Sequence, residues 1–353
     1  MTIAIAAAGT GGHVFPALAV AEALHVLGVA RSDVVFFGGD RLEARVVPAA
    51  GYELIQLRMA GLARSFSLRN ARVVGQLLAA ARAVRRQIRD RHVTAVLAMG
   101  GYITGPAAIA ARRAGVPLLI HEQNAVPGRA NRWAARWADS VFVAFPAAQA
   151  ALTRAEVVGN PLRADLVTRV PSRVEALDRY GLSPDRPVIG ILGGSQGAAV
   201  LNVAAAALAG GGSQLLHLAG PDQHTEWTAR AAGESHWHVV PFEDQMGYFY
   251  AAADVAIARA GALTVSELAV TGTPSILVPY PGAGGHQRAN AAFLVDAGGA
   301  VLLDQEQLDR LPAVVEAALV PEELARRRAA ARAVGKPDAA GRVAAAVLEA
   351  AGA

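Results

Sequence analysis

The stretch "TIAIAAAGTGGHVFPALAVAEAL", residues 2–24, decides the fold of this chain. Residues 2–8 are apolar and predict a buried strand, and residues 16–28 have the pattern of a helix. The glycines at 9–12 predict a tight turn between them, where the backbone can approach a phosphate and the helix N–H groups can bind it. A turn without any ligand explains one such loop equally well.

Strands and helices alternate along the whole chain. In the first half the sequence predicts helices at 16–28 and 71–91 and strands at 2–8, 33–39, 94–101, 116–124 and 140–145. A connector with Pro and Arg, residues 157–173, breaks this rhythm, and residues 186–208 then repeat strand, glycine loop and helix. The pattern predicts an α/β fold of two Rossmann-like, doubly wound domains, 1–160 and 161–337. The last helical run, about 338–353, could complete the second domain or pack back on the first.

Glycine loops follow three predicted strands, at 9–12, 100–101 and 193–197. Ligands of parallel sheets bind at the carboxyl ends of the strands. Three loops at strand ends therefore favour phosphate binding, in a cleft that two facing domains would enclose.

The composition excludes several classes of protein. The chain has 353 residues, is 53% hydrophobic and 18% charged, carries a net charge of +4, and contains no cysteine. Disulfides, thiolate zinc sites and cysteine nucleophiles are therefore excluded. We expect a cytoplasmic protein, free or peripherally bound, because the chain lacks a basic leader and its long uncharged stretches contain Pro and Gly. It has no Asp-x-Asp, so we expect no protein-held metal, and we expect no cofactor.

The first glycine loop departs from the dinucleotide fingerprint. Val14 stands where the third glycine of G-x-G-x-x-G would be, and Asp40 follows two glycines after the second strand. A nicotinamide-dependent oxidoreductase therefore remains only an alternative. His13 can act as a general base, because a neutral imidazole at physiological pH can take a proton from a hydroxyl. A structural histidine that hydrogen-bonds its own loop is an equally good explanation of its position.

A second cluster lies at residues 258–292. Thr264 and Ser266 are expected in the first turn of a helix, which makes an anion site together with the free N–H groups. Glu267 could accept two hydrogen bonds from a ribose diol, or could simply be an acid favoured by the helix dipole. Neutral groups suited to sugar hydroxyls follow at His286, Gln287 and Asn290.

Several motifs of the chain occur together in a specific order: "GTGGHVFPALAVAEAL", "MGGYITGP", "HEQNAVPGRANRW", "VVGNPLR", "GGSQGA" and "RAGALTVSELAVTGTP". In this order, from about residue 3 to 340, the chain resembles the MurG family, the bacterial transferases that add N-acetylglucosamine (GlcNAc) to lipid I to make lipid II. The resemblance implies a GT-B fold and an inverting transfer from UDP-GlcNAc to the 4-hydroxyl of the muramyl sugar. It also implies a place at the cytoplasmic face of the plasma membrane.

The resemblance also implies a role for individual residues. His13 would be the base, and the acceptor side would include Gly101, Tyr102, His121 and Glu122. Residues 1–160 would bind the acceptor and the membrane, and residues 161–337 would bind UDP-GlcNAc. The donor residues would be Thr10, Gly11, Gly12, Asn124, Arg163, Ser195, Glu243, Ala262, Leu263, Thr264, Val265, Ser266, Glu267, Gln287 and Asn290, with Arg259 a weaker candidate.

Other functions remain open beside this one. A UDP-GlcNAc 2-epimerase would share the fold and the nucleotide sugar without using a lipid. A membrane-bound scaffold would hold the nucleotide sugar for another subunit. The partners expected from the resemblance are UDP-GlcNAc, lipid I and an anionic membrane surface, with no nucleic acid.

A basic amphipathic segment at residues 64–91 could dock on that membrane surface. Its arginines are Arg64, Arg69, Arg72, Arg82, Arg85, Arg86, Arg89 and Arg91, and Asp90 is its acid. Apolar residues recur beside them at helical spacing, at Val73, Val74, Leu77, Leu78, Val84 and Ile88. The same pattern describes a helix packed on its own sheet. We expect most of the apolar face to be core and only its exposed edge to meet lipid.

Overall fold

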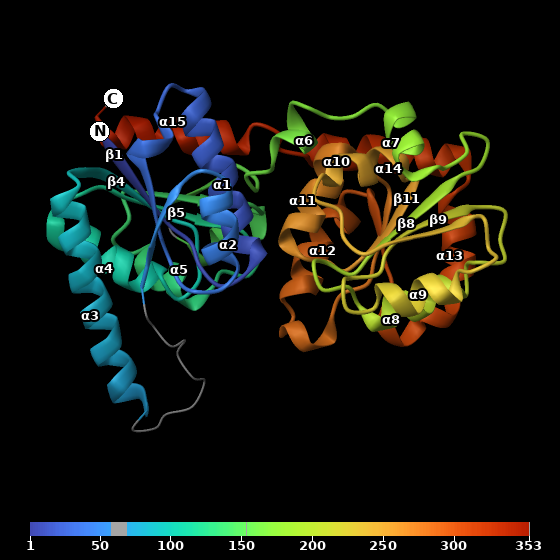
Figure 1. Cartoon of the computed structure of the whole chain (residues 1–353), viewed down its shortest axis with the longest axis horizontal. Coiled ribbons are helices and arrows are strands. Elements are labelled where there is room, and N and C mark those ends of the chain that lie inside the picture. The colour runs from blue at the N-terminus through green and yellow to red at the C-terminus, as the bar shows by residue number, and fades with distance from the viewer. Residues whose placement is uncertain (58–68, 153, 353) are drawn as a thin grey trace. The chain divides into compact units, whose positions relative to one another are not determined.

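The computed structural model describes residues 1–57, 69–152 and 154–352, with only the helical backbone described for 69–74. The described chain divides into two compact units, Met1–Arg163 with Pro337–Ala353, and Ala164–Lys336. Each unit is built on a parallel sheet flanked by helices (Figure 1).

In the first unit the described residues form a seven-stranded parallel sheet in the order β3-β2-β1-β4-β5-β6-β7. The strands are β1 Thr2–Ala6, β2 Val34–Gly38, β3 Glu53–Gln56, β4 Val93–Ala98, β5 Leu118–Glu122, β6 Ser140–Val143 and β7 Ala155–Val157. The sequence predicted the buried strands and missed β3 and β7. These two form the edges of the sheet, where a short and partly exposed strand carries no continuous apolar run.

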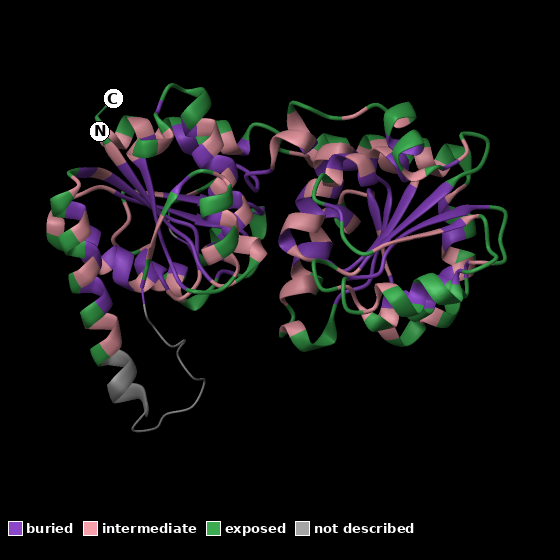
Figure 2. Cartoon of the chain, viewed as in Figure 1, coloured by how far each residue is buried: buried purple, intermediate pink, exposed green. Residues whose placement is uncertain are grey.

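Alternate residues of β1 face the two sides of this sheet. Ile3 and Ile5 belong to the core formed with α1 (Gly11–Val26), α2 (Leu42–Ala49) and α15 (Ala339–Ala351). Ala4 and Ala6 belong to the opposite core, formed with α3 (Arg69–Asp90), α4 (Thr104–Ala114) and α5 (Arg129–Ala134). Figure 2 shows the buried strands between these exposed helix surfaces. The short helices of the unit are η1 Arg31–Asp33 and η2 Pro146–Ala151.

The last helix, α15, packs against the first unit. Val343, Ala344 and Val347 are fully buried in the same core as Val14 and Leu24 of α1. Burying a valine contributes about 1.5–3 kcal/mol, so this apolar face holds the chain end on α1. The sequence left open whether this last helix completes the second domain or packs back on the first, and in the structure it packs on the first.

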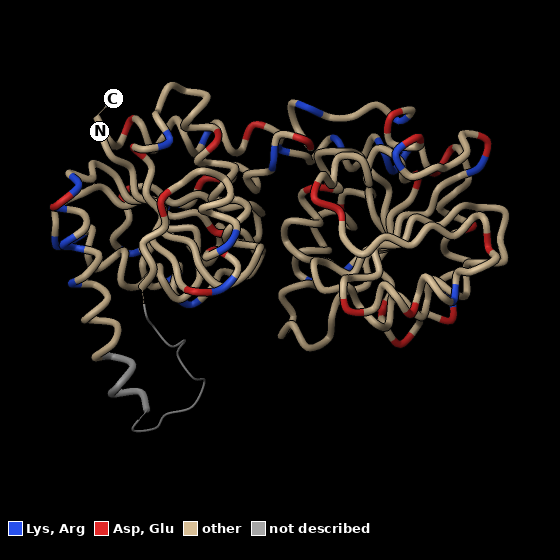
Figure 3. Tube along the Cα trace, in the orientation of Figure 1, with Lys and Arg blue, Asp and Glu red and all other residues tan. Residues whose placement is uncertain are grey.

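In the part of α3 whose side chains are described, apolar residues are buried and arginines are exposed. Val84 and Ile88 lie in the core beside α4, whereas Arg85 and Arg89 are exposed. Figure 3 shows the basic positions toward the end of this helix. Arg64 lies outside the described residues, as do the side chains of Arg69, Arg72, Val73 and Val74. Among the described helices, none has the length and apolar composition needed to cross a membrane.

In the second unit the described residues form a six-stranded parallel sheet in the order β10-β9-β8-β11-β12-β13. The strands are β8 Val188–Leu192, β9 Gln214–Leu218, β10 Trp237–Val240, β11 Val255–Ala258, β12 Ser275–Leu277 and β13 Ala300–Leu302. The helices are α6 Ala164–Val167, α7 Arg173–Tyr180, α8 Ala199–Ala206, α9 His224–Arg230, α10 Met246–Ala252, α11 Ala262–Thr271, η3 Pro281–Ala283, α12 His286–Asp296, η4 Gln305–Arg310, α13 Leu311–Ala318 and α14 Pro321–Val334.

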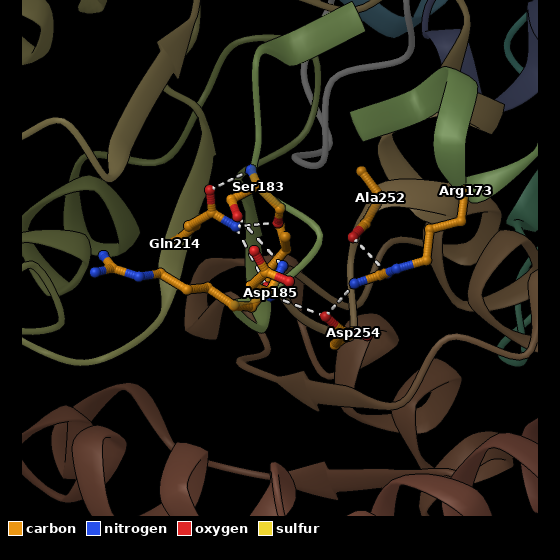
Figure 4. A network of polar contacts seen from close by, with 8 residues as sticks. Arg173, Ser183, Asp185, Gln214, Ala252 and Asp254 are labelled. Atoms are coloured by element: carbon orange, nitrogen blue, oxygen red, sulfur yellow. Dashed lines mark hydrogen bonds and ion pairs between the residues drawn. The ribbon is translucent and has the colours of Figure 1, made fainter. Parts of the chain in front are cut away.

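A polar network ties the chain to the amino ends of these strands (Figure 4). The Asp254 carboxylate accepts hydrogen bonds from Arg173 and from the N–H of Val188, both at 2.8 Å. The Gln214 side chain accepts from the N–H of Ser183 at 2.7 Å and donates to its carbonyl at 2.8 Å. These contacts fix the segment that enters β8, and the glycine loops lie at the opposite, carboxyl edge of the sheet.

Candidate active site

Two glycine loops meet at the carboxyl edge of the first sheet, after β1 and after β4. Gly9, Gly100 and Gly101 have positive φ angles of 100°, 106° and 80°, which favour glycine. A Cβ on Gly101 would lie 2.4 Å from the carbonyl oxygen of Ala8, and one on Gly100 would lie 2.5 Å from Cδ2 of His13. The imidazole therefore lies directly against the backbone of the second loop.

His13 is the third residue of α1, and its Nδ1 lies 3.3 Å from the Thr10 hydroxyl oxygen. Burial lowers the pKa of His13 below its ordinary value. The charges of Glu122 and Glu43 and a hydrogen bond with the Ala8 backbone act in the opposite direction, without reversing the shift. His13 is therefore neutral near pH 7, the form that a general base requires.

Glu43, in the first turn of α2, is a buried acid that the sequence did not single out. Its carboxylate accepts hydrogen bonds from the N–H of Gly39 at 2.9 Å and from the N–H of Gly9 at 3.2 Å. Tyr102 lies in the same place, because a Cβ on Gly39 would be 1.7 Å from its hydroxyl oxygen. Burial and the charges of Glu43 and Asp40 raise the pKa of Tyr102. Glu43 thus fixes the backbone of the loop that leads to His13.

The Glu122 carboxylate lies beneath the loop that follows β5. It accepts hydrogen bonds from the N–H of Asn124 at 2.9 Å, from the N–H of Gly128 at 3.0 Å and from the side chain of Asn131 at 2.9 Å. Glu122 is 1% exposed, so it acts by holding this loop and by its charge near His13. Asn124 is partly exposed on the loop itself.

His121 is completely buried, and its Nε2 lies 2.8 Å from the carbonyl oxygen of Gly159. Burial lowers the pKa of His121 to about 4, so the ring is neutral. The resemblance implied an acceptor-side position for His121. The structure gives its ring a partner inside the protein.

Arg163 ends the first unit beside the start of α1. Its guanidinium lies 5.7 Å from the centre of the Phe15 ring, a cation–π distance. The same ring would be 3.0 Å from a Cβ on Gly11. The first unit therefore brings Arg163 to the loop that carries Thr10, Gly11 and Gly12.

In the second unit the glycine loop after β8 packs tightly on the loop after β9. A Cβ on Gly197 would lie 2.2 Å from the carbonyl oxygen of Ala219, and one on Gly220 would lie 2.5 Å from that of Gln196. Ser195 is exposed at the tip of this loop. The close packing explains the glycines and leaves the Ser195 hydroxyl accessible.

Helix α11 begins at Ala262, and this corrects one expectation from the sequence. Thr264 lies in the first turn as expected, whereas Ser266 lies in the second turn and is buried. The reason is that Gly261 is extended and caps the helix directly before Ala262. Leu263 and Val265 belong to the first turn together with Thr264. Glu267 follows in the second turn, and its carboxylate accepts a hydrogen bond from the Tyr250 hydroxyl at 2.8 Å.

Helix α12 lies next to the start of α11. The side chain of Asn290 is buried and donates to the carbonyl of Ala260 at 3.3 Å. Gln287 is partly exposed and accepts from the N–H of Tyr280 at 2.8 Å. The Asn290 contact brings α12, which carries both residues predicted for the sugar, close to the start of α11, where the sequence predicted an anion site.

Arg259 has a structural position. It donates to the carbonyl of Val278 at 3.1 Å and to the side chain of Gln305 at 2.7 Å, and burial lowers its pKa. The guanidinium therefore joins the ends of β11 and β12 from within.

Glu243 is 5% exposed and accepts hydrogen bonds from Arg179 at 3.0 Å, from the Tyr180 hydroxyl at 2.7 Å and from the N–H of Gln245 at 2.7 Å. Burial alone would raise the pKa of Glu243, but these hydrogen bonds outweigh it and lower the pKa. The oxygens of the Glu243 carboxylate are thus occupied by hydrogen bonds within the protein. A nucleobase at this place would contact the backbone around Glu243 rather than its carboxylate.

Within the described residues, no three His, Asp or Glu side chains gather as metal ligands would. The first unit offers a neutral imidazole, and each unit offers exposed hydroxyls or amides and backbone N–H groups at a helix start.

Two family models match the chain. The glycosyltransferase family 28 N-terminal domain matches residues 3–143, and the family 28 C-terminal domain matches residues 188–343. The crystal structure of Acinetobacter baumannii MurG is similar over 99% of both chains, with 30% identity and a TM-score of 0.78. UDP-GlcNAc 2-epimerase from Neisseria meningitidis is 13% identical with a TM-score of 0.70, which shows a common fold alone. The chain is a family 28 glycosyltransferase with the GT-B fold.

Curated relatives narrow this class. One from Halorhodospira halophila is 43% identical over 97% of this chain and 96% of its own length. Another, from Acidithiobacillus ferrooxidans, is 46% identical over 99% of this chain and 98% of its own. The chain belongs to their family, the UDP-N-acetylglucosamine–N-acetylmuramyl-(pentapeptide) pyrophosphoryl-undecaprenol N-acetylglucosamine transferases.

Proposed function

We propose that this protein transfers GlcNAc from UDP-GlcNAc to lipid I, the undecaprenyl-pyrophosphoryl N-acetylmuramyl-pentapeptide. The products are lipid II, used in peptidoglycan synthesis, and UDP. The observation that carries this proposal is the similarity of 43–46% identity over nearly the full chain to transferases named for this donor and this acceptor. The fold alone would fit an epimerase as well.

His13 serves as the general base in this proposal. It takes the proton of the muramyl 4-hydroxyl while that oxygen attacks the anomeric carbon of GlcNAc from the face opposite UDP, which inverts the configuration. The neutral state of the imidazole and its place against Gly100 of the loop after β4 support this role. General-base catalysis contributes about 10²- to 10⁴-fold to the rate.

The second unit binds the donor in this proposal. The start of α11, with Thr264, stabilises the charge that grows on the diphosphate as the glycosidic bond breaks. Glu267 accepts from the ribose hydroxyls, and Gln287 and Asn290 bind the hydroxyls of GlcNAc. The backbone near Glu243 meets the uracil.

The protein binds the membrane peripherally in this proposal. The exposed Arg85 and Arg89 of α3 support it, because the ion pairs described here are those of their neighbours, Arg86 with Asp90 at 4.0 Å and Arg91 with Glu53 at 2.7 Å. A juxtamembrane arginine contributes about 1 kcal/mol of attraction to an anionic surface.

The test incubates the protein with UDP-GlcNAc and a short-chain lipid I analogue, with either chelator or Mg²⁺, and measures UDP and disaccharide together. Equal formation of both products is expected. Epimerised nucleotide sugar without disaccharide would establish the epimerase instead. Binding of UDP without any product in either buffer would reject the transferase and support a scaffold.

A further inference from the structure

Gln123, the residue directly after β5, is 1% exposed and lies between two histidines. Its side-chain Nε2 is 3.1 Å from Nδ1 of His121 and 3.2 Å from the His121 carbonyl oxygen. Its carbonyl oxygen Oε1 has no hydrogen-bond partner among the described residues. A buried acceptor without a donor costs about 1–3 kcal/mol, so this oxygen calls for an explanation.

The surrounding contacts fix which way the Gln123 amide points. The Gly159 carbonyl can only accept, so His121 must carry its proton on Nε2. The ring is neutral, since burial lowers its pKa to about 4, and Nδ1 can therefore only accept. The amide group next to Nδ1 must then be the NH₂ of Gln123. Its Oε1 is consequently directed to the opposite side.

His13 lies close to this oxygen. The point that a Cβ of Gly100 would occupy is 3.4 Å from Oε1 of Gln123 and 2.8 Å from Nε2 of His13. Gly100 has no Cβ there, and the imidazole edge and the buried oxygen approach the same space. The remaining ring nitrogen, Nδ1, lies on the side of the Thr10 hydroxyl.

We propose that Gln123 is a positioning residue: a small rotation of its amide, beyond the arrangement described above, brings Oε1 into a hydrogen bond with Nε2–H of His13 and so makes Nδ1 the base. This inference rests on the proposed function, in which His13 deprotonates the acceptor. In the resting protein the Thr10 hydroxyl donates to Nδ1, and the acceptor hydroxyl takes its place. As the new C–O bond forms and the bond to UDP breaks, the proton passes to Nδ1. The imidazolium then has its second N–H on Gln123.

The groups that face His13 are compatible with this arrangement. Glu122 on β5 and Glu43 on α2 both favour the imidazolium by their charge, and the Ala8 backbone accepts from the ring. The charges do not choose between the two neutral tautomers, whereas a hydrogen-bond acceptor beside one nitrogen does. Gln123 and Ala8 are therefore the two candidates for that choice, and the experiment must separate them.

The experiment measures the imidazole ¹⁵N chemical shifts of the ¹⁵N-histidine-labelled full chain, with His13 assigned from the His13→Asn spectrum. Neutral His13 is expected as the Nε2–H tautomer in the unmodified protein and as a mixture in Gln123→Leu. The same variant should lose turnover by about 10- to 100-fold, the usual effect of an orienting partner, with KM for UDP-GlcNAc unchanged. Asn131→Leu is the matched control, since it removes buried hydrogen bonds to Glu122 and to the His121 carbonyl and should leave the tautomer unchanged.

Gln123→Glu keeps an acceptor and adds a negative charge. It is the second variant for the measurement if Gln123→Leu fails to fold. It should retain the Nε2–H tautomer and move the acidic limb of the kcat/KM profile to higher pH, because the charge raises the pKa of His13. An Nδ1–H tautomer in the unmodified protein would overturn the inference. So would unchanged shifts in Gln123→Leu, which would assign the tautomer to Ala8. Absence of transfer by the unmodified protein would reject the proposed function, while the tautomer would still report the contact.

Discussion

The two units begin alike, each with a buried strand, a glycine loop and a helix, and the two loops differ in the side chains that lie beside them. The loop after β1 leads into α1, whose third residue is His13, and it is held by the buried acid Glu43. The close contacts of the loop after β8 are to backbone atoms, and its exposed tip carries Ser195. In the proposed function, the same backbone arrangement therefore supports a proton acceptor in the first unit and an anion or hydroxyl contact in the second.

The largest expected effect concerns the group that distinguishes the loops. His13→Ala should lower turnover by about 10²- to 10⁴-fold, because the acceptor hydroxyl loses its base. UDP binding should stay unchanged, since the imidazole is proposed to act on the acceptor. Steady-state kinetics with a lipid I analogue and calorimetry with UDP measure the two. Ser195→Ala is the matched change in the second loop and should affect KM for the donor more than kcat. Near-normal turnover of His13→Ala would erase the difference between the loops.

The next effect tests how His13 is supported. A Cβ in Gly100→Ala would lie 2.5 Å from the His13 ring, at a residue whose φ is +106°. We expect a loss of about 1–3 kcal/mol from backbone strain. Turnover should fall by about 10- to 100-fold, because a small displacement of the base is costly. Urea unfolding and kcat measure both losses.

The control for this substitution is Gly28→Ala. Gly28 has a φ of +98° and no atom within 4 Å of its Cβ position, so the alanine adds strain without a collision. It should lose stability and keep its turnover. Equal loss of turnover in the two variants would show that Gly100 matters only to folding.

The comparison also shows what a sequence can predict at such a site. The glycine turn at residues 9–12 and the helix that carries Thr264 were predicted because strand, glycine and helix are neighbours in the sequence. Glu43 was missed because its hydrogen bond to Gly9 joins residues 34 positions apart, and its place in a helix start is an ordinary one for an acid. Ser266 was placed one turn too early, since only the extended Gly261 shows where the helix begins.

For the residues at the end of β5, the sequence likewise did not predict burial. A family resemblance carries His121 and Glu122 as site residues without saying which atoms face a ligand. In the structure the Glu122 carboxylate accepts hydrogen bonds from loop N–H groups and from Asn131. The His121 Nε2 is hydrogen-bonded to the Gly159 carbonyl. Burial and hydrogen bonding depend on the whole sheet, so they could not be predicted from four adjacent letters.

A smaller effect is expected from the acid beneath the first loop. Burial holds the pKa of His13 below its ordinary value, and the charge of Glu43 opposes that shift. Glu43→Gln removes the charge, so the pKa of His13 should fall further and the acidic limb of kcat/KM should move to lower pH. The amide also loses an acceptor for Gly9 or Gly39, at a cost of about 1–3 kcal/mol in stability.

The control here is Asp40→Asn. Asp40 is exposed and its charge acts on Tyr102, so its removal should leave the acidic limb in place. A pH profile that shifts equally in both variants would mean that Glu43 acts only through the net charge of the protein.

The smallest expected effect concerns binding to anionic vesicles, for which we compare an exposed arginine of the first unit with one of the second. Arg85→Ala removes one exposed arginine of α3, and binding to vesicles with anionic lipid should weaken by about 1 kcal/mol, or roughly fivefold. Arg310→Ala removes an exposed arginine of the second unit and is the matched control, with no change expected. Cosedimentation with vesicles of increasing anionic content measures both, and salt should reduce the difference because it screens exposed charges. Equal weakening by both substitutions would indicate a general attraction of a basic protein, and α3 would then have no special part in docking.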